Sequence, residues 1–291
     1  GVPNPGDRGP ENMSIELPEA LILARQMKEQ LVGKVVRSHH LKDCQNLQRM
    51  GFVNRDARDF DRLVGGTIDS VTSRGNSILM KLRNGMNLVL APEYGGVVLY
   101  HAQDSDLPSS YHLRLDFADG TFLTTRLTSM GCINSVPDDK LEDNYIYRRD
   151  FLGRPSPVDE GFTFESFSGM LGAGNRMLKS NLVGKDAVVT GLGNSAFQEI
   201  AYKARIHPKV KASDLDGGRK RALYEAVREV IKGRIKKGGK SDFLDLYGKR
   251  GRYEPAMGSH MKGLTCPRCG TAIESISIAG GPSYFCPSCQ R

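Results

Sequence analysis

The sequence lacks a long apolar run, a secretory signal and an internal repeat. No stretch approaches the roughly 18 consecutive apolar residues that a membrane-spanning helix needs. The first residues also lack the charged and apolar regions of a signal peptide. These absences exclude a membrane-spanning helix and favour a cytoplasmic protein with no membrane partner.

The composition is that of a globular protein with a moderate excess of positive charge. Of its 291 residues 39% are hydrophobic, enough to bury a core, and the length suggests two or three domains. Lys and Arg number 41 against 33 Asp and Glu, so the formal net charge is +8. That sign favours a polyanionic partner such as nucleic acid, although charge alone does not identify one.

Most of the six cysteines lie in two CPxC pairs near the C-terminus, at Cys266, Cys269, Cys286 and Cys289. In a reducing compartment this spacing predicts a structural zinc ion with four thiolate ligands, one ion per chain, rather than disulfides. The insert at 270–285 alternates apolar and polar residues and contains Gly280-Gly281, which predicts a β-hairpin. A catalytic zinc is a remote alternative. Cys44 and Cys132 are isolated and are expected to be buried thiols.

The N-terminal part of the chain predicts a helix followed by an antiparallel sheet. Residues 1–13 are rich in Gly and Pro and are expected to be a leader or to be disordered. Helical periodicity runs from Leu17 to Leu31, and Pro18 is tolerated in the first turn. Residues 14–137 are expected to form a β-sandwich, with strands at 35–41, 67–73, 77–82, 87–91, 112–117 and 121–127. Hairpin turns are expected at Asn84-Gly85 and Asp119-Gly120.

The rest of the chain predicts a helical domain and a small metal-bound module. A charged stretch with several prolines at 138–160 is expected to be a hinge. Residues 161–255 predict helices joined by short turns, at 164–171, 176–182, 194–204, 212–215 and 218–236. The basic stretch 236–252 is expected to be flexible and to lead to the zinc finger at 262–291. The fold class is therefore a multidomain α+β protein.

Three separated motifs, in order, resemble one family. Residues 16–19 read Glu-Leu-Pro-Glu, residues 191–194 read Gly-Leu-Gly-Asn and are followed by Ala-Arg-Ile-His-Pro at 204–208, and residues 284–290 read Tyr-Phe-Cys-Pro-Ser-Cys-Gln. They resemble the N-terminus, the helix-two-turns-helix motif and the zinc finger of the formamidopyrimidine-DNA glycosylase and endonuclease VIII family of DNA-repair proteins. The resemblance covers nearly all of the chain from Ser14 to Arg291.

The resemblance implies a cleft between two domains that holds bent, damaged or abasic double-stranded DNA with one nucleotide extruded. It implies that Asn194 contacts phosphates near the lesion, with Lys179 as a helper; such contacts position the DNA without reading its sequence. From its place after Gly193 alone, Asn194 is equally a helix N-cap. We expect a monomeric, bacterial-type cytoplasmic protein that associates with the nucleoid when bound to DNA.

The chain departs from the family at the position of the catalytic nucleophile. The resemblance implies that an N-terminal proline amine attacks the sugar, and Ile15 stands at that position with Ser14 before it. An α-amine suits this reaction because its pKa of about 8 leaves more neutral amine at pH 7 than a lysine side chain has. Glu16 matches the family carboxylate that assists protonation; otherwise it is a charge at a helix N-terminus.

Other positions that contact DNA in the family are also changed. The hairpin that usually reads Arg-Gly-Lys is Arg74-Gly75-Asn76, and the zinc-finger arginine corresponds to Gly281. The loops that fill the gap left by the extruded nucleotide contain Tyr94 and Met130, which are candidate wedges or else ordinary loop residues.

These departures leave two main functional hypotheses. The first is a DNA glycosylase or abasic-site lyase with an altered nucleophile, either a Ser14 amine released by Met removal or a water assisted by Glu16. The second is a catalytically silent protein that binds damaged or bent DNA. RNA binding or an unrelated role is a third, smaller possibility. Under each hypothesis we expect the ordinary proline reaction to be weak or absent.

Overall fold

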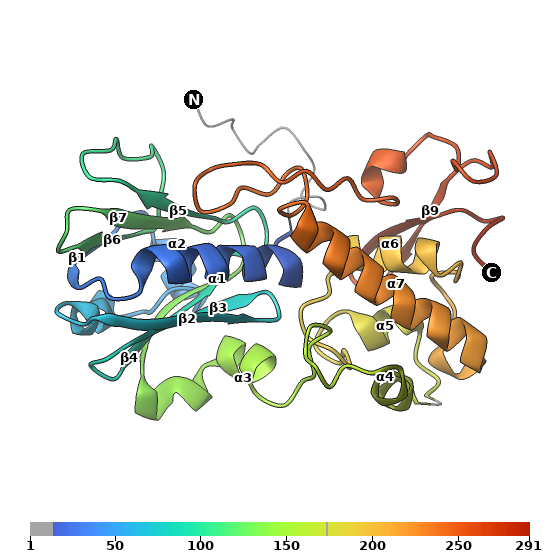
Figure 1. Cartoon of the computed structure of the whole chain (residues 1–291), viewed down its shortest axis with the longest axis horizontal. Coiled ribbons are helices and arrows are strands. Elements are labelled where there is room, and N and C mark those ends of the chain that lie inside the picture. Colours follow the sequence, from blue (N-terminus) through green and yellow to red (C-terminus); the bar gives the residue numbers. More distant parts are fainter. Residues whose placement is uncertain (1–13, 173) are drawn as a thin grey trace. The chain divides into compact units, whose positions relative to one another are not determined.

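The computed structural model describes residues 14–172 and 174–291, which form two units (Figure 1). The first contains the described residues up to Gly153 together with Ser241–Gly251, and the second contains Arg154–Lys240 and Arg252–Arg291. The predicted leader at 1–13 lies outside the described residues. No helix in the described ranges has the length and apolar character needed to cross a membrane.

The first unit contains two four-stranded antiparallel sheets, which confirms the predicted sandwich. One sheet has the order β1-β6-β7-β5 and the other β2-β3-β4-β8. The strands are β1 Val36–Leu41, β2 Ile68–Arg74, β3 Ser77–Leu82, β4 Met86–Ala91, β5 Val97–His101, β6 Leu113–Phe117, β7 Phe122–Arg126 and β8 Cys132–Pro137. Both predicted hairpin turns are present, between β3 and β4 and between β6 and β7. The sequence did not predict β5 and β8.

Helix α1 (Leu17–Leu31) packs on the β2–β3 side of the core and has the predicted bounds. Its apolar face buries Leu23, Met27 and Leu31, which belong to the main cluster of core residues. The helix begins after Glu16, and Pro18 lies in the first turn, where a missing N–H costs nothing. The short helices α2 (Gln45–Arg49) and η2 (Ala57–Leu63) complete this part of the chain.

The chain divides differently from the predicted domains. Within the predicted hinge at 138–160 the structure has η3 (Asp138–Asp143) and α3 (Tyr145–Phe151), and the change of unit falls at Gly153–Arg154. Residues 241–251, predicted within the helical domain, belong to the first unit. The stretch 236–252 is folded rather than an open linker, because its Phe243 and Leu246 join the sandwich core.

The second unit contains the predicted helices and the zinc hairpin. The helices are α4 (Phe164–Leu171), α5 (Leu178–Leu182), α6 (Asn194–Lys203), η4 (Ala212–Asp214), α7 (Gly217–Lys236) and η5 (Ser259–Met261). Strands β9 (Glu274–Ile278) and β10 (Gly281–Phe285) pair antiparallel, as predicted. Their two-residue turn has φ 42° at Ala279 and 89° at Gly280, and two positive φ values are the mark of a type I′ hairpin turn.

Candidate DNA-contact residues and zinc site

Glu16 is held at the start of α1 by a capping box. Its carboxylate accepts a hydrogen bond from the Glu19 backbone, and the Glu19 carboxylate accepts one from the Glu16 backbone nitrogen at 3.2 Å. The Ser14 hydroxyl donates to the Glu16 carboxylate at 3.2 Å. Glu16 is only 2% exposed. The carboxylate therefore caps the helix, which is the structural role that the sequence allowed; its role as a proton donor stays a prediction.

The backbone around Ile15 pairs with the loop at 92–96 that follows β4. The Ile15 nitrogen donates to the Glu93 carbonyl oxygen at 2.7 Å, and Ser14 forms an antiparallel bridge with Tyr94. The Ile15 side chain lies in the sandwich core. The Ile15 nitrogen, which the resemblance assigns to the nucleophile position, is thus an amide whose lone pair is delocalised into the peptide bond and whose hydrogen is bonded to Glu93.

Arg149, on α3, connects the loop after β4 with the β2–β3 hairpin. Its guanidinium donates to the Glu93 carboxylate and to the Asn76 side-chain oxygen, each at 2.6 Å, and to the Asp150 carboxylate at 2.8 Å. Burial lowers the pKa of Arg149, but the hydrogen bonds and charges of Asp150 and Glu93 outweigh it and raise the pKa. The cation is therefore permanent, and two carboxylates neutralise it.

The β2–β3 hairpin places Asn76 next to this cation. Arg74 ends β2 and pairs with Ser77 across the turn, and both Arg74 and Asn76 are partly exposed. Asn76 stands where the resemblance expects a lysine, and its amide oxygen accepts from Arg149 instead. This partner was not predictable from the sequence, because Arg149 lies in the segment predicted as a hinge.

Tyr94 and Met130 lie on two adjoining loops. Tyr94 is 43% exposed and Met130 47%. The Thr128 hydroxyl joins the loops by donating to the Gly95 carbonyl at 2.9 Å. The backbone at Gly131 packs closely against the end of β4, and only glycine fits there, since a Cβ would lie 2.2 Å from the Ala91 carbonyl oxygen. Burial, then the charges of Glu93 and Glu16, raise the pKa of Tyr94, so its phenol stays neutral.

In the second unit, Asn194 and Lys179 contact the zinc hairpin. The Asn194 side-chain nitrogen donates to the Pro282 carbonyl at 2.9 Å, and its oxygen is buried without a hydrogen-bond partner among the described residues. The N-cap of α6 is Gly193 rather than Asn194, and no side chain caps the helix; the N-cap prediction is therefore wrong. A phosphate contact by Asn194 stays a prediction.

Lys179 is 1% exposed, and its ammonium is directed at the hairpin. It donates to the carbonyls of Ile278 at 2.6 Å and Gly281 at 3.1 Å, and to the Ser283 hydroxyl at 3.2 Å. Gly281 lies beside Asn194, because a Cβ added there would be 3.6 Å from the Asn194 amide nitrogen. Lys179 and Asn194 together hold the backbone of the hairpin turn.

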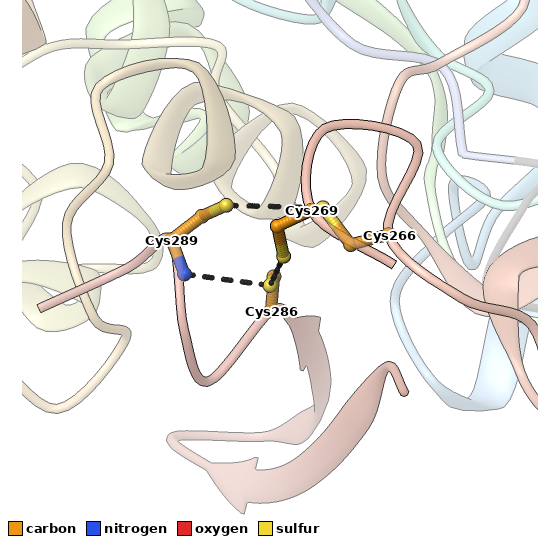
Figure 2. Close-up of side chains that lie close together, drawn as sticks. All are labelled: Cys266, Cys269, Cys286 and Cys289. Carbon is orange, nitrogen blue, oxygen red and sulfur yellow. Dashed lines mark hydrogen bonds between the residues drawn. The ribbon is translucent and has the colours of Figure 1, made fainter. Parts of the chain in front are cut away.

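The four cysteines gather at one point, as the spacing predicted. Figure 2 shows their sulfur atoms directed toward one another from two turns, and all four lie within 4.8 Å of one another. Cys266 and Cys289 sulfurs are 3.9 Å apart, and Cys269 and Cys286 sulfurs 3.5 Å. A tetrahedral zinc ion with Zn–S bonds of about 2.3 Å places its sulfurs about 3.8 Å apart. The residues fit one structural zinc ion.

Cys44 and Cys132, in the first unit, are buried, as predicted.

We predict that freshly purified, reduced protein contains one zinc ion per chain by elemental analysis. Changing Cys286 to Ser should remove most of the zinc and unfold the hairpin, because four thiolates are needed to complete the tetrahedral site and the module has little core of its own. Changing Cys132 to Ser is the matched control and should leave zinc content unchanged. Zinc-free wild-type protein with an ordered hairpin would contradict this prediction.

Comparisons with known proteins agree with this geometry. Three family models match the chain: the formamidopyrimidine-DNA glycosylase N-terminal domain at residues 15–127, the H2TH domain of the same proteins at 152–244, and a zinc finger found in FPG and IleRS at 263–291. Among solved structures, a complex between Lactococcus lactis Fpg and DNA containing an abasic site has a TM-score of 0.81 at 25% identity, covering 95% of this chain and 99% of that chain.

Curated relatives match over nearly their whole length. A formamidopyrimidine-DNA glycosylase from Desulforamulus reducens is 30% identical, covering 95% of this chain and 99% of its own. One from Streptococcus pneumoniae is 26% identical, with 95% and 98% covered. The matches run through the sandwich, the helical unit and the zinc finger alike, and on this basis the chain belongs to the formamidopyrimidine-DNA glycosylase family of DNA-repair proteins.

Proposed function

We propose that this protein binds duplex DNA containing a damaged or abasic nucleotide, and that the family's ordinary proline reaction is weak or absent in it. The observation that carries the second part is the hydrogen bond from the Ile15 amide nitrogen to the Glu93 carbonyl, 2.7 Å long. Binding is supported by family membership and by similarity to an Fpg solved with abasic-site DNA.

The proposed DNA contacts come from each unit separately. In the second unit, the backbone N–H groups in the first turn of α6, beside Asn194, are donors for a phosphate, and the helix dipole favours an anion there. In the first unit, Arg74 and Asn76 face the DNA strand that carries the lesion. Tyr94 and Met130 fill the gap left by the extruded nucleotide, since both side chains are large, mainly apolar and exposed. Gly281 contributes backbone only. Lys179 acts through the hairpin that it holds.

Loss of the amine reaction follows from the chemistry of the nitrogen. A nucleophile needs a free lone pair close to the sugar carbon, and an amide nitrogen has none to offer. A Ser14 amine would lie up to one residue length, roughly 3.3 to 3.6 Å, from the proper place, when reacting atoms must approach to about 3 to 3.5 Å. The cation expected at position 76 is also replaced by an amide.

A second candidate function is base excision by water. The buried Glu16 carboxylate, with the Ser14 hydroxyl 3.2 Å away, is the observation that favours it, because a carboxylate in a buried site is suited to activate water. Such a reaction would release the base without a covalent adduct to the protein. We further propose that the protein acts as a cytoplasmic monomer, on the nucleoid when bound to DNA, as suits a relative of bacterial repair proteins.

We predict that duplex binding weakens strongly between about 50 and 200 mM salt, because bound lysines release counterions from DNA. Of the basic run at 232–237, Lys232, Lys236 and Lys237 are exposed. Arg234, in the same run, is fully buried and paired with Glu199 at 3.3 Å, so it is not expected to contact DNA. Changing one exposed lysine that contacts a phosphate to Gln should reduce the magnitude of the slope of log K against log salt concentration by about one. Salt-independent affinity would contradict this interface.

We predict that restoring the nucleophile restores the family reaction. A variant that begins with proline in place of Ile15, with Asn76 changed to Lys, should form more borohydride-trapped adduct on abasic duplex than the parent, because it regains a free amine and a cation near the strand. The matched control begins at the same proline and keeps Asn76. Trapping by the parent as efficient as that of the double variant would show that these substitutions are not disabling.

A further inference from the structure

Three side chains on one face of α6 bind the zinc module. Asn194, Gln198 and Tyr202 are spaced by four residues, so they lie on the same side of the helix. Asn194 donates to the Pro282 carbonyl, and the Gln198 side chain accepts from the Tyr284 backbone nitrogen at 2.9 Å. The Tyr202 hydroxyl lies 3.5 Å from the Cys266 sulfur. The helix thus contacts the hairpin at one end and a metal ligand at the other.

The direction of the Tyr202 contact follows from the chemistry of the site. Cysteines bind zinc as thiolates, which have no proton to donate. A hydrogen bond between Tyr202 and a zinc-bound Cys266 must therefore run from the phenol hydroxyl to the sulfur. The hydroxyl is in place for it because Tyr202 is 3% exposed and belongs to the apolar cluster around Cys266, Cys286 and Met257.

Arg268 fixes the Tyr202 ring from the side of the module. Its guanidinium lies over the ring at 4.2 Å from the centroid, and it donates to the Tyr202 carbonyl at 2.9 Å. Arg268 belongs to the first CPxC turn, between the two cysteines of that pair. Arg268 thus contacts both the ring and the backbone of Tyr202 from the turn that carries two of the four ligands.

We propose that Tyr202 is a positioning residue of the zinc site, an outer hydrogen-bond donor to the Cys266 thiolate that couples metal binding to helix α6. Hydrogen bonds to metal ligands orient them and tune their donation, and losing one typically costs about 10- to 100-fold in metal affinity. Contacts within the module itself do not supply this coupling: Thr271 lies beside Cys269, and the Cys289 nitrogen contacts the Cys286 sulfur. Tyr202 reaches the metal site from the helix that carries Asn194.

The test compares Tyr202→Phe with Tyr224→Phe in the otherwise intact protein. Tyr224 is a matched control, since it too is buried in the second unit and donates its hydroxyl, at 2.9 Å, to the Phe162 carbonyl rather than to sulfur. Zinc affinity is measured at fixed pH by competition with a chromogenic chelator. Tyr202→Phe should bind zinc about 10-fold more weakly than the parent, and Tyr224→Phe should bind it as the parent does.

The absorption spectrum of the cobalt(II)-substituted protein is a second measurement, and it does not depend on DNA binding. Removing a hydrogen bond from a thiolate raises the energy of its sulfur lone pair, so the sulfur-to-cobalt charge-transfer band of Tyr202→Phe should move to longer wavelength. The band of Tyr224→Phe should not move. Unchanged zinc affinity and an unchanged band in Tyr202→Phe would overturn the proposal. Equal losses in both variants would overturn it as well, because they would reflect the loss of any buried hydroxyl. Neither result would bear on whether the protein binds damaged DNA.

Discussion

The hydrogen bond between the Ile15 nitrogen and the Glu93 carbonyl is the constraint on which the first unit's candidate site depends. It keeps residues 14 and 15 paired with the loop at 92–96, so that the chain enters α1 with Glu16 as its cap. The same Glu93 binds Arg149 through its carboxylate, and Arg149 binds Asn76. Glu93 and Arg149 therefore connect the backbone of Ile15 with Asn76 on the β2–β3 hairpin.

The second unit is organised around α6 in a comparable way. One face of the helix holds the zinc hairpin, and Ser195 and Glu199 on another face meet the buried Arg234 of α7, each at 3.3 Å. Removing one partner of such a buried pair is expected to be strongly destabilising, because it leaves an uncompensated charge. The helix start that we propose for phosphate binding is thus supported on two sides. Helix α6 therefore joins the zinc hairpin to α7 within the second unit.

Much of the fold could be predicted from sequence because its signals are local. Helix α1, most strands and the cysteine pairs follow from periodicity, turn residues and spacing. Strand β8 was not predicted because it is covered on both faces. Its residues Cys132, Ile133, Ser135 and Val136 are all buried, so its sequence does not alternate between apolar and polar residues. The stretch at 241–251 was predicted to be flexible because its sequence shows no local pattern. Only Phe243 and Leu246 of this stretch enter the core, and their partners lie far away along the chain.

The candidate site was predictable where motifs carry it and not where distant contacts do. The zinc ligands, Glu16 and Asn194 stand within recognisable patterns. The role of Lys179 depends on acceptors about 100 residues away in the hairpin, and no local pattern distinguishes a buried lysine from an exposed one. Arg149 and Tyr202 gave no signal for the same reason. Gln198 could have been found, because it lies one helical turn after Asn194 on the same face.

The most direct test of whether an amine near Ile15 reacts is borohydride trapping of the unaltered protein on a duplex with one abasic site. The protein is used at concentrations that saturate binding, and the peptide that carries any adduct is identified by mass spectrometry. Our account predicts saturable binding with no adduct above that on undamaged duplex. A rapidly formed adduct mapped to residues 14–16 would contradict it, because it would show that an amine at this position still reacts.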